Sequence, residues 1–143
     1  MGKKRIMKKS GGSDVVGKSR ALTRIPKKKL ASGCLNILAT FNNTLLTLSD
    51  SKGNAVISAS SGALGFKGAR KSTPFAAAKV GEIIGEKAQQ MGMKEVEVVV
   101  RGAGSGRESA LRSFAGMGIN VTKIIDKTPV PFNGPRRPKA RRV

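Results

Sequence analysis

The sequence predicts an α/β fold: a single domain with a mixed five-stranded sheet in the order βββαβαβ, helices packed on that sheet, and basic extensions at both termini. Three observations support this prediction. Short β-prone apolar runs come first, stretches with helical apolar spacing then alternate with further runs, and most of the net charge lies outside this region. An antiparallel meander that leads into β-α-β-α-β units gives a mixed sheet.

The positive charge is large and unevenly distributed. The 143 residues include 28 Lys and Arg against 8 Asp and Glu, a formal net charge of +20. Residues 1–29 hold 11 basic residues and one acid, and residues 127–143 hold six basic residues and no acid. Segments of this kind bury too little apolar surface to fold alone. We therefore predict a basic N-terminal extension at 1–32, a folded domain at 33–126 and a basic Pro/Arg-rich arm at 127–143.

The first half of the predicted sheet is a meander. Its β-prone runs are residues 34–41, 44–49 and 55–60. Asn42 and Asn43 separate the first two runs, and both tolerate the left-handed conformation that a tight turn needs. A second turn, at residues 50–54, contains Asp, Ser, Gly and Asn and leads into the third run.

A helix is predicted after the meander. Thr73 can cap its start, and Pro74 suits the first helical position. Gly92 is predicted to end the helix as a left-handed cap. The apolar residues that share one face are Ala76, Val80, Ile83, Ile84, Ala88 and Met91.

The second half of the sheet is predicted from two further runs. Residues 95–100 contain a continuous valine run, which indicates a parallel strand buried on both faces. Ser105 and Glu108 have the spacing of a capping box, so a second helix is predicted to start there. Residues 119–125 form the last predicted strand before the arm.

Catalysis and metal chemistry are disfavoured by the composition. The chain has no His and a single cysteine, Cys34, which excludes a disulfide framework, a zinc site and the Ser-His and Cys-His nucleophile pairs. The carboxylates are scattered over separate predicted elements and make no cluster for a metal-dependent nuclease. We expect no enzymatic activity and no cofactor.

Membrane association and targeting are weighed from the same sequence. No apolar run reaches the 18 residues of a membrane span, and the arms show no amphipathic basic helix for a membrane surface. No apolar region of the secretory type follows the basic N-terminus. An organellar transit peptide stays open as an alternative for residues 1–29.

Nucleic acid is the favoured polyanionic partner because such a charge excess needs neutralising. The chain has five Phe and no Trp or Tyr, so it can build no extensive platform for stacking single-stranded bases. We expect it to grip folded RNA through phosphate and 2′-hydroxyl contacts, with little base readout. A DNA-binding architectural protein is the rival hypothesis, although no exposed apolar wedge stands out.

Three segments are candidates for holding phosphates. Residues 66–74 place three cations just before a predicted helix start, where a phosphate is favoured. Residues 102–107 are glycine-rich and end in Arg, but they match neither the dinucleotide fingerprint nor the NTPase phosphate loop, and a purely structural turn is as good an interpretation. Residues 136–142 hold five cations, mostly Arg, whose planar fork suits phosphate.

Several ordered motifs resemble one known family. They are Phe41-Asn42-Asn43-Thr44, Gly65-Phe66-Lys67-Gly68, Arg70-Lys71-Ser72-Thr73-Pro74-Phe75, Gly104-x-Gly106-Arg107-Glu108-Ser109, Asp126-x-Thr128-Pro129 and the Arg-rich ending. With this order and spacing, the stretch from about Gly33 to Val143 resembles the small-subunit ribosomal protein eleven family.

The resemblance implies a ribonuclease-H-like fold without catalysis and a structural role in the small ribosomal subunit. It also implies binding to central-domain ribosomal RNA (rRNA) at the platform, next to other platform proteins and near the messenger RNA exit and the exit-tRNA site. Messenger RNA is a further partner there, and a stand-alone homo-oligomer is not expected. The ending resembles the bacterial type, in the cytoplasm, and a bacterial-type ribosome inside an organelle stays open. A nucleic-acid-binding architectural protein outside the ribosome is the alternative.

The family motifs carry over to RNA-contact residues position by position. The expected contacts are Asn42, Asn43, Thr44, Lys67, Arg70, Lys71, Ser72, Arg107, Asn133, Gly134, Arg136, Arg137, Lys139, Arg141 and Arg142.

Overall fold

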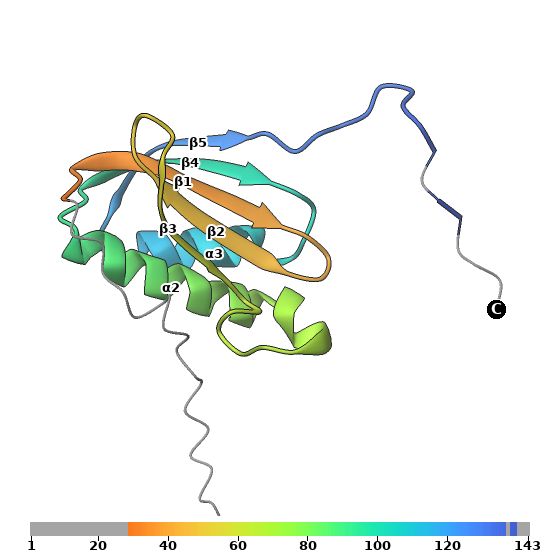
Figure 1. Cartoon of the computed structure of the whole chain (residues 1–143), viewed down its shortest axis with the longest axis horizontal. Coiled ribbons are helices and arrows are strands. Elements are labelled where there is room, and N and C mark those ends of the chain that lie inside the picture. The colour runs from red at the N-terminus through yellow and green to blue at the C-terminus, as the bar shows by residue number, and fades with distance from the viewer. Residues whose placement is uncertain (1–28, 137, 140–143) are drawn as a thin grey trace, which may run out of the picture.

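The computed structural model describes residues 29–136, 138 and 139. The predictions for residues 1–28 lie outside this part of the chain. The elements are β1 (Ser32–Ala39), β2 (Thr44–Ser49), β3 (Ala55–Ser60), the 3₁₀ helix η1 (Gly68–Ser72), α2 (Pro74–Gln90), β4 (Glu95–Arg101), α3 (Gly106–Ala115) and β5 (Asn120–Asp126). The predicted α/β fold and its βββαβαβ order are therefore confirmed (Figure 1).

The five strands form one mixed sheet in the spatial order β3-β2-β1-β4-β5. β1 pairs antiparallel with β2, and β2 with β3, whereas β1, β4 and β5 run parallel to one another. The carboxyl ends of β1, β4 and β5 therefore lie at the same end of the sheet as the first residue of β2. This topology decides which loops can meet.

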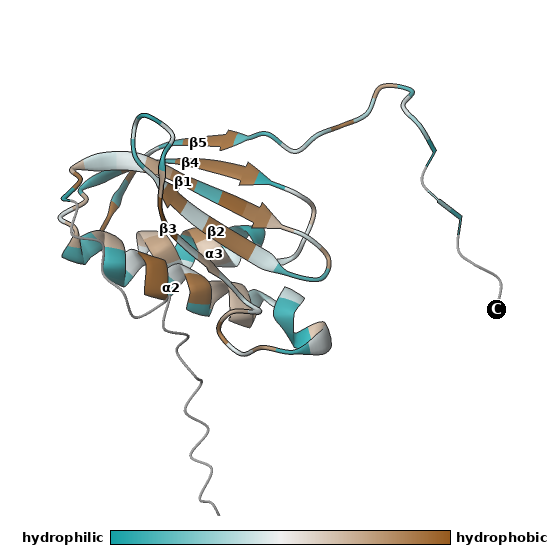
Figure 2. Cartoon of the chain, in the orientation of Figure 1, coloured by the Kyte–Doolittle hydropathy of each residue, from teal (hydrophilic) through white to brown (hydrophobic). Residues whose placement is uncertain are grey.

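Both helices cover the same face of the sheet (Figure 1). Strand residues that point toward the helices are apolar and buried, as in the alternation of Leu35, Ile37 and Ala39 along β1. The apolar residues of the strands and of α2 accordingly face each other across this layer (Figure 2). No helix in the described part of the chain is both long enough and apolar enough to cross a membrane.

Glycines allow the two helices to pack closely. A Cβ atom added to Gly81 of α2 would lie 2.6 Å from the carbonyl oxygen of Ala110 of α3, which is below any normal contact. Gly85, one turn later, faces the Met117 side chain, which follows α3. At Gly81 the helix backbones approach to a distance that a larger residue would prevent.

The opposite face of the sheet is open in the described part of the chain. The valine run of β4 predicted burial on both faces, and this prediction is wrong for part of the strand. Val96, Val98 and Val100 face the helices, but Glu97 on the other face is exposed, and only Val99 is buried there. The strand is parallel as predicted, yet none of the described residues forms a second layer over this face, because both helices pack on the other face of the sheet.

Candidate nucleic-acid interface

Four segments meet at one end of the sheet, at the carboxyl ends of its parallel strands. They are the β1–β2 turn at 40–43, the loop at 61–73 that contains η1, the β4–α3 loop at 102–105, and residues 127–128 after β5. We call this region the loop end. It lies on the right of the molecule in Figure 1, opposite the end where the β2–β3 turn and the start of β4 lie.

The β1–β2 turn is organised by a hydroxyl group. Thr40 Oγ1 accepts hydrogen bonds from the backbone N–H groups of Asn42 (3.4 Å) and Asn43 (3.1 Å). Neither asparagine has a positive φ, so the predicted left-handed turn is wrong. β1 ends at Ala39, two residues earlier than predicted, which leaves a four-residue connection that a threonine side chain can stabilise.

The asparagines of this turn have different roles. The Asn42 side chain is exposed and available for contact. Asn43 Oδ1 accepts a hydrogen bond from the Gly62 N–H at 3.3 Å, which ties the turn to the loop after β3. A Cβ on Gly62 would lie 3.6 Å from Cδ of Lys71, so the Lys71 stem packs beside the same junction. Asn43 and Lys71, 28 positions apart in the sequence, are thereby brought together.

The basic loop leads into the capped helix that the sequence predicts. Thr73 Oγ1 accepts the Ala76 N–H at 3.3 Å, and Pro74 occupies the first turn, so this prediction is confirmed. The Ala77 N–H bonds to the Thr73 carbonyl at 3.1 Å. Because Pro74 has no N–H, the Phe75 N–H is the free donor of this turn within the described residues. The phosphate site at the helix start is thus smaller than a bare helix N-terminus would offer.

The predicted capping box of α3 is wrong. Ser105 has helical dihedral angles (φ −67°, ψ −14°) and makes no side-chain bond to the helix backbone. Its hydroxyl instead donates to the carbonyl oxygen of Ser72 at 2.8 Å. A cap needs an extended backbone so that its side chain can turn back onto the helix. Ser105 therefore joins two loops of the loop end.

The glycines of the β4–α3 loop serve close backbone packing. Gly102 has a φ of +95°, and a Cβ there would lie 2.1 Å from the Ala39 carbonyl oxygen. Gly104 donates its N–H to that same oxygen at 2.9 Å. The structural interpretation of this segment is thus favoured over a phosphate cradle, because the backbone is occupied by the end of β1.

Thr44, one of the predicted RNA contacts, is not exposed in the structure. Its side chain is fully buried, and a Cβ on Gly106 would lie 2.5 Å from its Oγ1. Thr44 is the first residue of β2, and its side chain points to the face of the sheet that the helices cover. It is therefore enclosed between the sheet and α3. The sequence motif placed it in line with Asn42 and Asn43 but gave no sign of this change of face.

The Arg107 side chain is bound to its own domain. Its guanidinium donates to the Gly102 carbonyl at 2.7 Å and to Thr128 Oγ1 at 3.4 Å, and it forms an ion pair with Asp126. Gly102 N–H donates to Thr128 Oγ1 at 3.2 Å, completing the link between the β4–α3 loop and the end of β5. We call the set Gly102, Arg107, Asp126 and Thr128 the latch. Arg107 is therefore chiefly a positioning residue in this structure.

The carboxylate of the latch is strongly stabilised in its charged form. Asp126 Oδ1 accepts the Thr128 hydroxyl at 2.6 Å and the Thr128 N–H at 2.9 Å. These two bonds, followed by the interaction with Arg107, lower the pKa of Asp126 from 3.8 to about 2. The sequence contained a sign of this role, since Asp-x-Thr is a spacing at which the side chain can bond the backbone two residues on.

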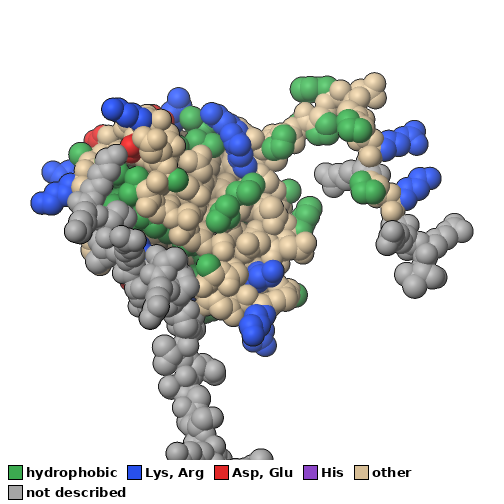
Figure 3. Space-filling model, in the orientation of Figure 1, with side chains coloured by type: hydrophobic (Ala, Val, Ile, Leu, Met, Phe, Trp, Pro, Cys, Tyr) green, Lys and Arg blue, Asp and Glu red, His purple; other side chains and the backbone are tan. Residues whose placement is uncertain are grey.

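The C-terminal arm leaves the domain at the latch and extends away from it (Figures 1 and 3). Asn133 adopts a φ of 55°, the only non-glycine residue with positive φ in the described part of the chain. Gly134, Arg136 and Lys139 are exposed on the same arm. The remaining predicted arm contacts, Arg137, Arg141 and Arg142, lie outside the described residues.

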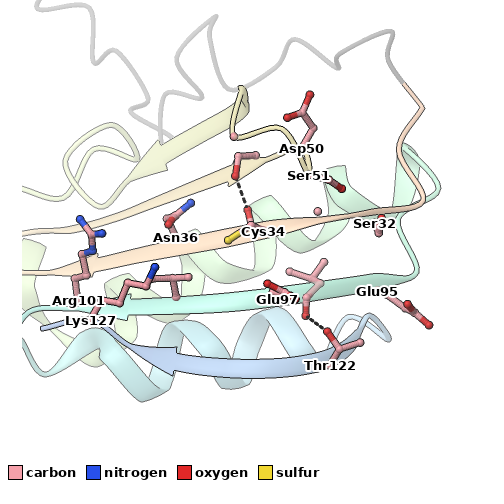
Figure 4. A pocket seen from close by; sticks show the side chains of 15 residues that line it. Ser32, Cys34, Asn36, Asp50, Ser51, Glu95, Glu97, Arg101, Thr122 and Lys127 are labelled. Carbon is pink, nitrogen blue, oxygen red and sulfur yellow. Dashed lines mark hydrogen bonds between the residues drawn. The ribbon is translucent and has the colours of Figure 1, made fainter.

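An open trough of about 540 Å³ lies on the uncovered sheet face (Figure 4). Cys34 lines it, and burial followed by the nearby Glu97 raises the pKa of its thiol, so the reactive thiolate is disfavoured. Among the described residues, no three His, Cys, Asp or Glu side chains come close enough to hold a metal ion. Arg101 and Lys127 line the trough toward the loop end, and they are cations that the sequence interpretation missed.

Residues 33–142 match the model of the family described as Ribosomal protein S11. The chain belongs to this family. Family S11 proteins are structural components of the small ribosomal subunit that bind rRNA and neighbouring ribosomal proteins, and they are not enzymes. The predicted fold, the structural role in the small subunit and the absence of catalysis are thus confirmed for this S11 chain.

Proposed function

We propose that this S11 chain binds central-domain rRNA at the platform of the small subunit, near the exit of messenger RNA, in a bacterial-type ribosome. The loop end is its rigid RNA-binding surface, and the C-terminal arm is a second element that enters the RNA. Neighbouring platform proteins and messenger RNA are further partners. The family membership supports the rRNA-binding role, and the geometry of the loop end supports the residues that carry it.

The observation that carries this proposal is the convergence of the predicted contacts on one end of the sheet. Asn43 and Lys71 meet across Gly62, and Ser72 is joined to Ser105. Lys67 and Arg70 are exposed on the same loop. Residues that are distant in the sequence therefore form one basic surface, as phosphate groups along a folded RNA require.

The arm is positioned to extend this surface. The latch fixes residues 126–128 against the β4–α3 loop, so the chain leaves the domain from the loop end and not from an arbitrary direction. Beyond the latch the prolines favour an extended chain, and Arg136 and Lys139 are exposed on it. Basic side chains on an extended segment neutralise successive phosphates and release counterions.

The proposal can be tested with a cleavage probe attached to a single cysteine. Cys34→Ala removes the native thiol, and Lys67→Cys or Lys52→Cys then places Fe-EDTA at the loop end or at the opposite end of the sheet. Reconstituted small subunits should show strong cleavage of central-domain rRNA from position 67 and much weaker cleavage from position 52. Equal cleavage from both positions, or failure of the protein to sediment with the small subunit, would contradict the proposal.

A further inference from the structure

The aromatic residues of this chain are unusually exposed. It has only five phenylalanines, and three of them leave most of their surface in solvent: Phe41 (72% exposed), Phe75 (63%) and Phe132 (94%). Phe41 lies in the β1–β2 turn, Phe75 in the first turn of α2, and Phe132 on the arm. Phe41 and Phe132 belong to segments proposed to bind RNA, and Phe75 lies just after the basic loop, although burial would be the usual location for such rings.

The Phe75 ring is held in place while it stays exposed. It packs edge-to-face with Phe66, with ring centres 6.2 Å apart and an interplanar angle of 85°. Phe66 is half-buried and rests on the hydrophobic core, so it provides a fixed support. Lys79 Nζ lies 5.9 Å from the centre of the Phe75 ring and is itself paired with Glu82 at 2.7 Å. Such an arrangement lowers the entropy lost when a ligand meets the ring.

The surroundings of this ring favour a polyanion. Residues 61–81 contain four basic side chains and no acid, and one of the four, Lys79, is paired with Glu82. Lys67, Arg70 and Lys71 lie on the loop that precedes the ring. The backbone N–H of Phe75, in the first turn of α2, is a free hydrogen-bond donor beside them in the sequence. A protein partner would have to bring its own carboxylates to match these charges, whereas an RNA strand brings phosphates together with a flat apolar base.

We propose that Phe75 stacks on the base of an unpaired nucleotide in the bound RNA, while the basic side chains before α2 hold the flanking phosphates. This inference rests on the proposed RNA-binding function and deepens it. The scarcity of aromatics in the sequence correctly argues against an extensive stacking platform, but one fixed ring is enough for one base. Stacking is tolerant of base identity, so the site selects an extruded nucleotide and not a particular base.

The test compares two RNA hairpins that differ in one nucleotide. One carries a single bulged 2-aminopurine in its stem, and the other has the same stem fully paired. The full chain is titrated with each, and the ratio of the two dissociation constants gives the preference for the bulge. Phe75→Leu keeps an apolar side chain without the aromatic face, Phe75→Trp restores an aromatic face, and Ile124→Ala removes a similarly exposed apolar group (59% exposed) from β5 as a control.

We expect the wild type to bind the bulged hairpin more tightly than the fully paired one. The fluorescence of the 2-aminopurine should change when the base stacks on the Phe75 ring. Phe75→Leu should reduce the affinity for the bulged hairpin by roughly 5- to 100-fold, the range that corresponds to one lost base–aromatic stack. Phe75→Trp and Ile124→Ala should keep the preference. Thermal melts should be nearly unchanged because the ring is exposed.

Two results would overturn the inference. In the first, Phe75→Leu keeps the wild-type preference, which would show that the ring does not stack on the bulged base. In the second, the wild type binds both hairpins equally with a strong salt dependence, which leaves the RNA-binding function intact and removes only the stacking site. Absence of binding to either hairpin would count against both the inference and the proposed function.

Discussion

Arg107, at the start of α3, is paired with Asp126, the last residue of β5, and this pair joins the start of α3 to the carboxyl end of the edge strand β5. The same guanidinium holds the Gly102 carbonyl at 2.7 Å. An arginine in a glycine-rich loop that the sequence associates with phosphate is thus used to orient the C-terminal arm. We therefore expect it to contribute to RNA binding mainly through the position of other residues.

Arg107→Gln should accordingly affect stability more than electrostatic binding. Loss of the bond to the Gly102 carbonyl, about 1 kcal/mol for a typical hydrogen bond, should lower the melting temperature by roughly 5 °C. The slope of log affinity against log salt should hardly change, because no phosphate contact is lost. A slope smaller by about 0.7–0.9 with an unchanged melt would instead identify Arg107 as a direct phosphate ligand.

Asp126 should make stability depend on pH in a defined window. Its pKa is about 2 in the folded protein against an ordinary value of 3.8, so the folded state binds this proton less readily than the unfolded state. The stabilisation is therefore complete above about pH 5 and is lost as the pH falls toward 2. The difference in free energy of unfolding between wild type and Asp126→Asn, measured with urea, should be largest above pH 5 and shrink toward pH 2. A difference that stays constant over this range would contradict the assignment.

Gly102 should be the glycine of the loop end that is least replaceable. Gly102→Ala combines a positive φ with a Cβ placed 2.1 Å from a backbone oxygen, and should destabilise the fold by about 2–4 kcal/mol. Gly53 is the matched control, since its φ is +87° and a Cβ there meets nothing within 4 Å. Gly53→Ala should cost only about 1 kcal/mol, the conformational part alone. Equal losses in urea unfolding would show that the Ala39 contact relaxes freely.

How far the sequence predicts this protein depends on whether a feature is local. The capped start of α2 was predictable because Thr73 and Pro74 act on their own helix. Ser105 was not, since its hydroxyl bonds to Ser72, 33 positions away, and only the strand order brings these loops together. Asn42 and Asn43 gave the place of the turn correctly, but Thr40 determines its conformation.

The candidate site shows the same division. Charge identifies the cations Lys67, Arg70 and Lys71, of which Lys67 and Arg70 are exposed and Lys71 is half-buried. It does not distinguish them from Arg107, whose partners come from the β4–α3 loop, from the last residue of β5 and from Thr128 after it. The sequence likewise shows that aromatic residues are few. It does not show that three of the phenylalanines are exposed, because exposure depends on tertiary packing.

The cations of the η1 loop should account for a distinct part of the salt dependence. Replacing Lys67, Arg70 and Lys71 together by Gln should lower the slope of log affinity against log salt by about 2–3, close to 0.7–0.9 for each phosphate contact. The matched control replaces Lys52, Lys94 and Lys123, which removes the same charge away from the loop end. A mere change in net charge would affect both triple variants equally, so equal slopes would refute a localised interface.

Removal of residues 135–143 should separate binding from folding. The described residues of this segment are exposed, and the latch that holds the arm ends at Thr128, so the melting temperature should stay within about 1–2 °C of the wild type. The affinity for rRNA should nevertheless fall, because the deletion removes five cations that we propose to neutralise phosphates. A variant of the same length in which these five cations are replaced by Gln distinguishes loss of charge from loss of the segment itself. It should bind as weakly as the deletion. Should the deletion instead unfold the domain, the segment would be part of the core and not an arm.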